Sequence, residues 1–142
     1  MRYLGLDLGT KTLGLAISDE SLTIASSLTI IRFDENDYDS VYEPLKSIVD
    51  EYNIVKFVLG LPKNMNNSLG FRAQTTIEFK DKLETWFNLD VVLEDERLTT
   101  IEATNYMLEA DLSRKKRKKK IDAVAASIIL QAYLDKEKRG GN

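Results

Sequence analysis

Hydrophobic and polar residues alternate at the start of the chain with the two-residue period of a β-strand. Over residues 3–8 the leucines share one face, and Tyr3, Gly5 and Asp7 share the other. After a turn at Gly9 the apolar residues alternate again, so the pattern predicts a β-hairpin. A further apolar stretch, rich in Thr and Ile, completes a predicted three-stranded antiparallel meander.

Later segments carry apolar residues at helical spacing or as short β-branched runs. The predicted strands cover 3–8, 13–17, 22–33, 54–59 and 91–93, and the predicted helices cover 38–52, 71–87, 99–110 and 121–134. Thr99 and Glu102 have the spacing of a capping box, which starts the third of these helices. Antiparallel strands followed by helix–strand units predict an α/β fold. Its mixed five-stranded sheet has three antiparallel strands, then two parallel ones, with helices on both faces.

The length of 142 residues suits one domain, and no repeat or linker divides the chain. We expect a single domain over residues 1–138 and a frayed C-terminal tail over 139–142. The first residues lead directly into a strand, with no long apolar segment and no signal-peptide cleavage site. We therefore expect a cytoplasmic protein that makes no membrane contact.

The sequence contains no cysteine and no histidine. Disulfides, thiolate catalysis and metal sites built from Cys or His are therefore excluded. Acid–base or metal chemistry has to rest on carboxylates and other oxygen ligands. Such ligands favour hard cations, of which Mg²⁺ and Mn²⁺ are the expected ones.

Positive charge is concentrated in one segment. Lys and Arg number 20 against 23 Asp and Glu, and seven of the basic residues are consecutive at 114–120. Such a run is ordinarily a solvated flank or a flexible loop. Here it directly precedes the predicted helix that carries Asp122, so it also suits an anionic polymer, whose binding would weaken steeply with salt.

Two carboxylates occupy positions where a charge needs a partner. Asp7 lies inside the first predicted strand beside small neighbours such as Gly5, where a charge is costly unless it is paired or binds a metal ion. Asp7 could instead accept hydrogen bonds from the amides of the following turn. Asp122 shares a helical face with Ala125 and Ile129, which directs it toward the sheet. An acid in the first turn of a helix also stabilises the helix dipole, so that role stays open.

Two strand ends supply further candidates. Asp95, Glu96 and Arg97 stand where a strand ends and a helix begins, which is where open α/β sheets place ligand contacts. Asp95 or Glu96 could supply a third carboxylate and Arg97 could hold a phosphate, or these residues could line a solvated loop. The turn from Gly60 to Asn64 also suits binding, although its spacing alone favours an ordinary loop.

Four motifs taken together resemble one protein family. They are Gly5-Leu6-Asp7-Leu8-Gly9-Thr10-Lys11-Thr12 with Gly14, Gly60-Leu61-Pro62 with Asn64-Met65, Asp95-Glu96-Arg97-Leu98-Thr99-Thr100 with Glu102-Ala103, and Ile121-Asp122 with Ala125-Ala126 and Ile129-Leu130. Their order and the overall length of the chain closely resemble the YqgF family, also called RuvX. The sequence departs from the family at Asn67-Ser68, where Asp-Gly is frequent, and in its dense basic run.

The resemblance implies a ribonuclease-H-like fold related to the RuvC Holliday junction resolvases. It also implies a metal-dependent nuclease that matures the 5′ end of precursor 16S ribosomal RNA. In that family Asp7, Glu96 and Asp122 correspond to an acidic site, in which Asp7 would bridge two Mg²⁺ or Mn²⁺ ions and the other two would complete their shells. The strand that ends at Gly60 lacks the glutamate that resolvases carry there, so the third ligand would come from the next strand.

The expected partners are nucleic acids: precursor ribosomal RNA, branched DNA or both. We also expect contact with a pre-ribosomal particle, and a monomer or weak homodimer. Side chains expected to contact or line the path of the backbone are Lys11, Asn64, Arg72, Arg97, Lys115, Lys116 and Lys118.

Two other functions fit parts of the sequence. The first hairpin also resembles the phosphate-binding turn of actin- and hexokinase-like ATPases, which need two such domains around one nucleotide. A ribosome-assembly or RNA-binding factor could keep the fold without cleaving. Calorimetry with ATP tests the first alternative. RNA binding that Asp7→Asn leaves unchanged, together with no cleavage in any metal, would favour the second.

Overall fold

The structure is a computed structural model that describes residues 1–61, 71–95 and 114–140. Within these ranges, the side chains of residues 71, 72, 95, 114–123, 139 and 140 are not described. The helix predicted over residues 99–110 lies outside the described residues.

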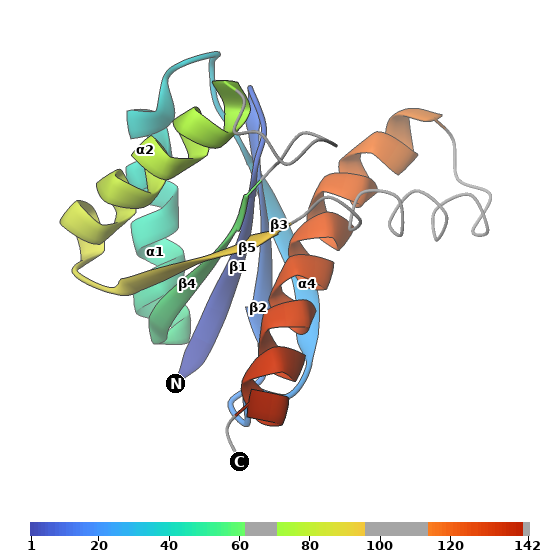
Figure 1. Cartoon of the computed structure of the whole chain (residues 1–142). Coiled ribbons are helices and arrows are strands. Elements are labelled where there is room, and N and C mark those ends of the chain that lie inside the picture. Colours follow the sequence, from blue (N-terminus) through green and yellow to red (C-terminus); the bar gives the residue numbers. More distant parts are fainter. Residues whose placement is uncertain (62–70, 96–113, 141–142) are drawn as a thin grey trace.

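A five-stranded sheet forms the centre of the molecule (Figure 1). The elements in chain order are β1 (Arg2–Leu8), β2 (Thr12–Ser18), β3 (Ala25–Arg32), the 3-10 turn η1 (Tyr38–Val41), α1 (Tyr42–Tyr52), β4 (Ile54–Leu61), α2 (Phe71–Phe87), β5 (Asp90–Asp95) and α4 (Arg114–Gly140). The strand order is β3-β2-β1-β4-β5, with antiparallel pairing among β1, β2 and β3 and parallel pairing of β1 with β4 and of β4 with β5. The predicted mixed sheet is therefore confirmed.

The alternation in the first two strands creates a separate core on each face of the sheet. The leucines of β1 join Leu45 of α1 and Leu83 of α2 in one core. On the opposite face, Tyr3 and Ala16 join Leu130 of α4 in the other. Figure 1 shows the same layers, with α1 and α2 on one side of the sheet and α4 crossing the other. Helices thus cover both faces, as the pattern predicted.

The predicted start of the final helix, at residue 121 after the basic run, was wrong. α4 already begins at Arg114, so the run belongs to the helix and is not a loop before it. Lys and Arg are good helix formers, and no Gly or Pro interrupts the segment up to Arg139. The run carries no apolar periodicity, so the pattern of hydrophobic residues could not reveal its helical state.

The third strand is shorter than predicted, because a turn occupies the residues before it. Asp19 accepts hydrogen bonds from the amides of Thr23 and Ile24 at 2.8 and 3.1 Å, and Leu22 has a positive φ of 59°. The strand begins only at Ala25. Among the described helices, none combines the length and the apolar character needed to cross a membrane.

Candidate functional site

Asp7 lies on β1, the central strand of the sheet, and its side chain is half-buried. Its pairing partner on β2 is Gly14. Continued by one residue, the parallel register of β1 and β4 places Gly60 on its other side. Because glycines flank Asp7 in both directions, no side chain of a neighbouring strand stands directly beside its carboxylate.

A second carboxylate lies in the same row across the sheet. Gly60 pairs with Glu94 of β5, so two inter-strand steps, about 10 Å, separate the Cα atoms of Asp7 and Glu94. Glu94 is only 5% exposed, and its Oε1 atom lies 2.6 Å from Nζ of Lys136 in α4. The sequence candidates begin at Asp95 and miss Glu94. The signal that could have found Glu94 is strand alternation. Glu94 lies two residues after Val92, which packs in the core under α4, so both residues share that face of the sheet.

Helix α4 lies directly on β1 at Gly5. A methyl group added to Gly5 would stand 2.7 Å from Cβ of Leu130 and 2.9 Å from the carbonyl oxygen of Ala126. Both Leu130 and Ala126 are fully buried. The helix backbone therefore approaches the sheet as closely as a residue without a side chain permits.

A polar cluster anchors the C-terminal part of α4 near the start of β1. The hydroxyls of Tyr3 and Tyr133 donate to the two oxygens of Glu137 at 3.3 and 2.9 Å. Lys56 Nζ lies 3.0 Å from the Tyr133 hydroxyl and 3.7 Å from Glu137. The hydrogen bond to Tyr133 raises the pKa of Lys56, and burial raises the pKa of Tyr3. Lys56 is therefore charged and Tyr3 protonated at neutral pH, which suits an anchor rather than proton transfer.

Gln131 fixes α4 to the edge of the sheet where β3 begins. Its Oε1 atom accepts a hydrogen bond from the amide of Ala25 at 2.8 Å, and its Nε2 atom donates to the carbonyl oxygen of Thr23 at 2.9 Å. Lys138 adds a hydrogen bond to the Thr23 hydroxyl at 2.9 Å. The start of β3 is thereby held by α4, so the helix is fixed at both sides of β1.

These contacts define where residue 122 lies along the helix. α4 runs antiparallel to β1, because its C-terminal part meets the start of β1 and Ala126 lies over Gly5. Asp7 is two residues beyond Gly5, and Asp122 is about one turn before Ala126. The two positions therefore belong to the same end of the contact between α4 and β1. The side chain of Asp122 is not among those described.

Lys11 is the predicted nucleic-acid contact whose side chain is described, and it is exposed in the turn between β1 and β2. The turn is closed by a hydrogen bond of 2.7 Å from the amide of Gly9 to the carbonyl oxygen of Thr12. Backbone positions alone are described for Arg72, in the first turn of α2, and for Lys115, Lys116 and Lys118, at the start of α4. Three further candidates lie outside the described residues: Asn64, Glu96 and Arg97.

The described side chains include only one of the three predicted metal ligands, Asp7. Within this part of the chain, no three acidic side chains come close enough together to hold a metal ion. The chemistry of the donors nevertheless matches a hard cation, since carboxylate oxygens are the ligands that such cations prefer and Asp7 is half-buried in the sheet.

Comparison with known proteins finds relatives that align with this chain over nearly its whole length. The sequence model of the RuvX family, described as Holliday junction resolvase, matches residues 1–136. A protein of Geobacillus thermodenitrificans named "Putative pre-16S rRNA nuclease" is 51% identical over 138 residues, which are 97% of this chain and 100% of the relative. A protein of Enterococcus faecalis with the same name is 49% identical over 140 residues, covering 98% of this chain and 100% of the relative.

Two solved structures share the fold at low sequence identity. T. thermophilus RuvC in complex with a Holliday junction substrate superposes with a TM-score of 0.62 at 14% identity, over 100% of this chain and 97% of RuvC. The fowlpox virus Holliday junction resolvase gives a TM-score of 0.56 at 19% identity, over 96% of this chain and 99% of the resolvase. The fold is thus that of the RuvC-like, ribonuclease-H-like resolvases, and by its sequence the chain belongs to the RuvX family.

Proposed function

We propose that this protein is a metal-dependent nuclease that hydrolyses phosphodiester bonds of structured nucleic acid. The observation that carries the proposal is the placement of Asp7. It stands on the central strand between two glycines, at the end of the sheet toward which the N-terminal half of α4 runs. The names of the relatives at about half identity support the same activity.

Asp7, Glu96 and Asp122 would hold Mg²⁺ or Mn²⁺. The resemblance to the YqgF family supports Glu96 over Asp95 as the third carboxylate. When bound, divalent cations would supply activation of water and stabilisation of the leaving oxygen.

The remaining predicted residues would position the nucleic acid. Lys11, Arg97 and the basic residues Lys115, Lys116 and Lys118 would hold phosphates, with Asn64 and Arg72 lining the path of the backbone. Since the basic run belongs to α4, its positive charge is carried by the same helix that carries Asp122. Binding and cleavage would then depend on the position of one helix.

The favoured substrate is precursor 16S ribosomal RNA, which matches the names of the relatives, and the proposed place of cleavage is its 5′ end. A four-way DNA junction is the second candidate, because the family description names junction resolution. We propose that the protein works in the cytoplasm on a pre-ribosomal particle, as a monomer or weak homodimer, with residues 1–138 as one nuclease domain.

The test is cleavage of both substrates by the purified protein with Mg²⁺ or Mn²⁺ and with EDTA. Asp7→Asn should lower the cleavage rate by more than about 100-fold, because the stabilisation that a bound metal gives to the transition state is worth several kcal/mol. Asp90→Asn is the matched control. Asp90 is exposed at the start of β5, away from the end where Asp7 lies, and its substitution should leave the rate unchanged.

An Asp7→Asn protein that cleaves at the wild-type rate would overturn the proposed site. If the wild-type protein cleaves neither substrate in any metal and Asp7→Asn binds RNA normally, the protein is an RNA-binding factor that keeps the fold without cleaving.

A further inference from the structure

Two cations at the end of the sheet where Asp7 lies have no side-chain partner among the described residues. They are Lys11 and Arg32, and both are exposed. Every other described Lys or Arg side chain forms an ion pair or, for Lys138, a hydrogen bond to the Thr23 hydroxyl. An exposed cation without an internal ion pair can bind an external anion without first breaking one.

Both cations are held at the rim of the sheet where β1 ends. Lys11 belongs to the turn between β1 and β2, and Arg32 is the last residue of β3, paired with Thr12. The amide of Phe33 donates a hydrogen bond of 2.9 Å to the carbonyl oxygen of Lys11, which ties the turn to the end of β3. Lys11 and Arg32 together are called the rim below.

The strand register places Arg32 on the same face of the sheet as Asp7. Gly14 pairs with Asp7, and Thr12, two residues earlier on β2, pairs with Arg32. Alternate positions of a strand share a face, so both pairs belong to the face that α4 covers. Two inter-strand steps of about 4.8 Å and one two-residue step of about 6.8 Å separate the Cα atoms of Arg32 and Asp7 by about 12 Å. If the scissile phosphate lies at Asp7, Arg32 is therefore placed to bind a neighbouring phosphate of the same strand.

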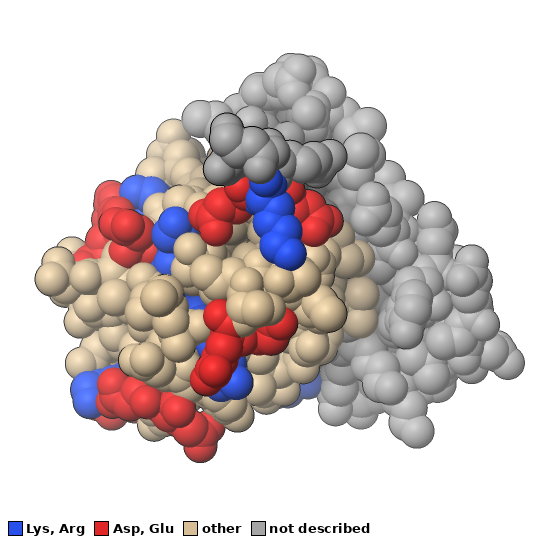
Figure 2. Space-filling view, turned by 90° about the horizontal axis from the view of Figure 1, so that it is seen from below, with Lys and Arg blue, Asp and Glu red and all other residues tan. Residues whose placement is uncertain are grey.

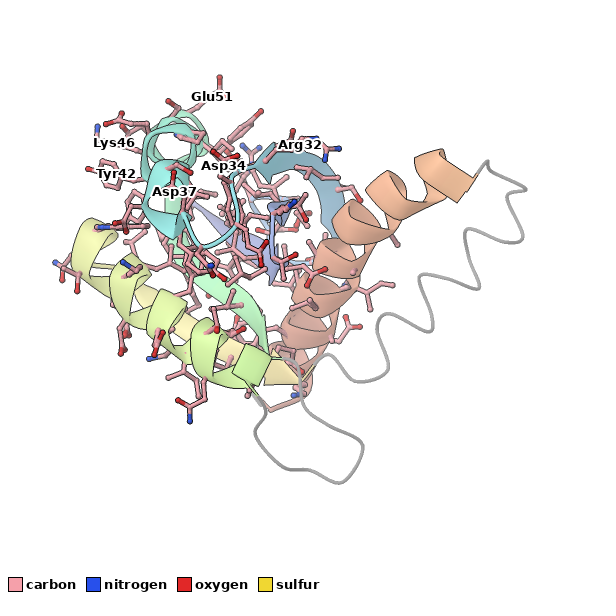
Figure 3. The ribbon with its side chains drawn as sticks, turned by 90° about the horizontal axis from the view of Figure 1, so that it is seen from above. Arg32, Asp34, Asp37, Tyr42, Lys46 and Glu51 are labelled. Carbon is pink, nitrogen blue, oxygen red and sulfur yellow. The ribbon has the colours of Figure 1, made fainter. Side chains whose placement is uncertain are left out.

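Acidic residues bound the rim on its other side. Asp34, Glu35 and Asp37 follow Arg32 in the chain and are exposed. Figure 3 shows Arg32 on β3, whereas Asp34 and Asp37 lie toward η1 and α1. A phosphate backbone is repelled by these carboxylates and attracted by the two cations. Its favoured course is over Gly14 toward Asp7, because Gly14 adds no side chain there, whereas Thr12 lies beside Arg32 at the start of this course.

We propose that Arg32, acting with Lys11, is a positioning residue that binds a backbone phosphate of the substrate strand and leads that strand across β2 to Asp7. The inference rests on the proposed nuclease function and extends it with a residue that sequence patterns did not reveal. The ligand chemistry is the phosphodiester backbone, which RNA and DNA share.

The experiment measures binding without cleavage, in EDTA, by fluorescence anisotropy of a labelled precursor ribosomal RNA fragment and of a labelled four-way DNA junction. Arg32→Gln should weaken binding about tenfold at low salt, since one charge-assisted hydrogen bond is lost. It should also reduce the slope of log affinity against log salt by about one ion. Arg32→Lys keeps the charge and should restore both values.

Arg2→Gln is the matched control, because Arg2 lies at the opposite end of the sheet and pairs there with Glu20 at 4.0 Å. Seen from that end, the described Lys and Arg side chains lie among Asp and Glu side chains rather than in one patch (Figure 2). Arg2→Gln should therefore bind as the wild type does.

If Arg32→Gln has a lower affinity for RNA alone, for the junction alone or for both, with the reduced salt slope, the result supports the rim and identifies the nucleic acid that it binds. Unchanged affinity of Arg32→Gln for both ligands, or weaker binding with an unchanged salt slope, overturns the proposal. Cleavage by Arg32→Gln in Mg²⁺ should show a raised KM at an unchanged kcat. Because binding is measured without metal, failure of the rim is distinguishable from failure of Asp7→Asn to abolish cleavage.

Discussion

Gly5→Ala tests whether the contact between α4 and β1 sets both stability and the site. The new methyl carbon would stand 2.7 Å from Cβ of Leu130 and 2.9 Å from the carbonyl oxygen of Ala126. Carbon atoms in contact prefer about 3.5 to 4.0 Å, so the helix has to withdraw by about 1 Å or the strand has to shift. Neither contact atom is the end of a flexible side chain, so local rotation cannot relieve the clash.

The size of the effect follows from two opposing terms. Overpacking a well-packed core costs about 1–3 kcal/mol. Replacing Gly by Ala also restricts the unfolded chain, which returns about 0.4–1 kcal/mol. The first term is larger, so Gly5→Ala should lower the free energy of unfolding by about 1–2 kcal/mol. Because α4 also carries Asp122, a displacement of about 1 Å should lower the cleavage rate by up to about 100-fold where the protein is still folded.

Urea unfolding followed by circular dichroism measures the stability, and cleavage assays well below the unfolding midpoint measure the rate. Gly9→Ala is the matched control for stability. Its methyl group would meet the side-chain oxygen of Thr12 at 3.1 Å and the Thr12 carbonyl oxygen at 3.3 Å, both longer than the contacts at Gly5, and no described glycine has a positive φ, so the change should cost less than Gly5→Ala does. A Gly5→Ala protein with the stability and the cleavage rate of the wild type would refute the direct packing of α4 on β1.

Two further predictions concern charged groups. Lys136→Ala leaves the buried Glu94 carboxylate without its partner and should cost about 1–3 kcal/mol. Glu94→Gln leaves only the exposed Lys136 unpaired and should cost less, so equal or reversed costs in urea unfolding would contradict the burial of Glu94. Asp19 responds to pH, because hydrogen bonds from the Ser21 hydroxyl and from two backbone amides lower its pKa from 3.8 to about 2. Since the folded-state pKa is the lower one, this stabilisation is complete above about pH 4 and is lost as the pH falls toward 2. The difference in unfolding free energy between the wild type and Asp19→Asn should therefore shrink over that range, and a constant difference would contradict the role of the Asp19 carboxylate.

The parts of the fold that the sequence predicted are those set by local burial. The alternation over residues 3–8 separates leucines from Tyr3, Gly5 and Asp7, and the two groups face different cores. The apolar helical face that contains Ala125 and Ile129 was predicted from their spacing, and both are buried, whereas the direction of the Asp122 side chain stays a prediction. In each case the local period and the burial agree, because packing against the sheet creates the pattern.

The residues that the sequence missed depend on pairing between distant strands. Glu94 joins the row of Asp7 only through the parallel registers of β1 with β4 and of β4 with β5. Arg32 reaches the face of Asp7 only through the register of β2 with β3, which includes an irregularity between Leu15 and Ala16. No local spacing encodes these registers, since they follow from how crossover segments and a bulge align the strands.

The small residues on the α4 face connect these observations. Gly14 and Gly60 occupy the positions beside Asp7 on the two adjoining strands, and Gly5 lets the backbone of α4 approach β1. The opposite face carries leucines at the matching positions of β1 and holds α1 and α2 at the distance that those side chains require. A larger residue at Gly14 or Gly60 would add apolar packing while it covered the carboxylate, and one at Gly5 would move the helix that carries Asp122. The face of the sheet that contains Asp7 therefore has less side-chain burial at the same positions where the proposed chemistry needs space beside a carboxylate and a close helix.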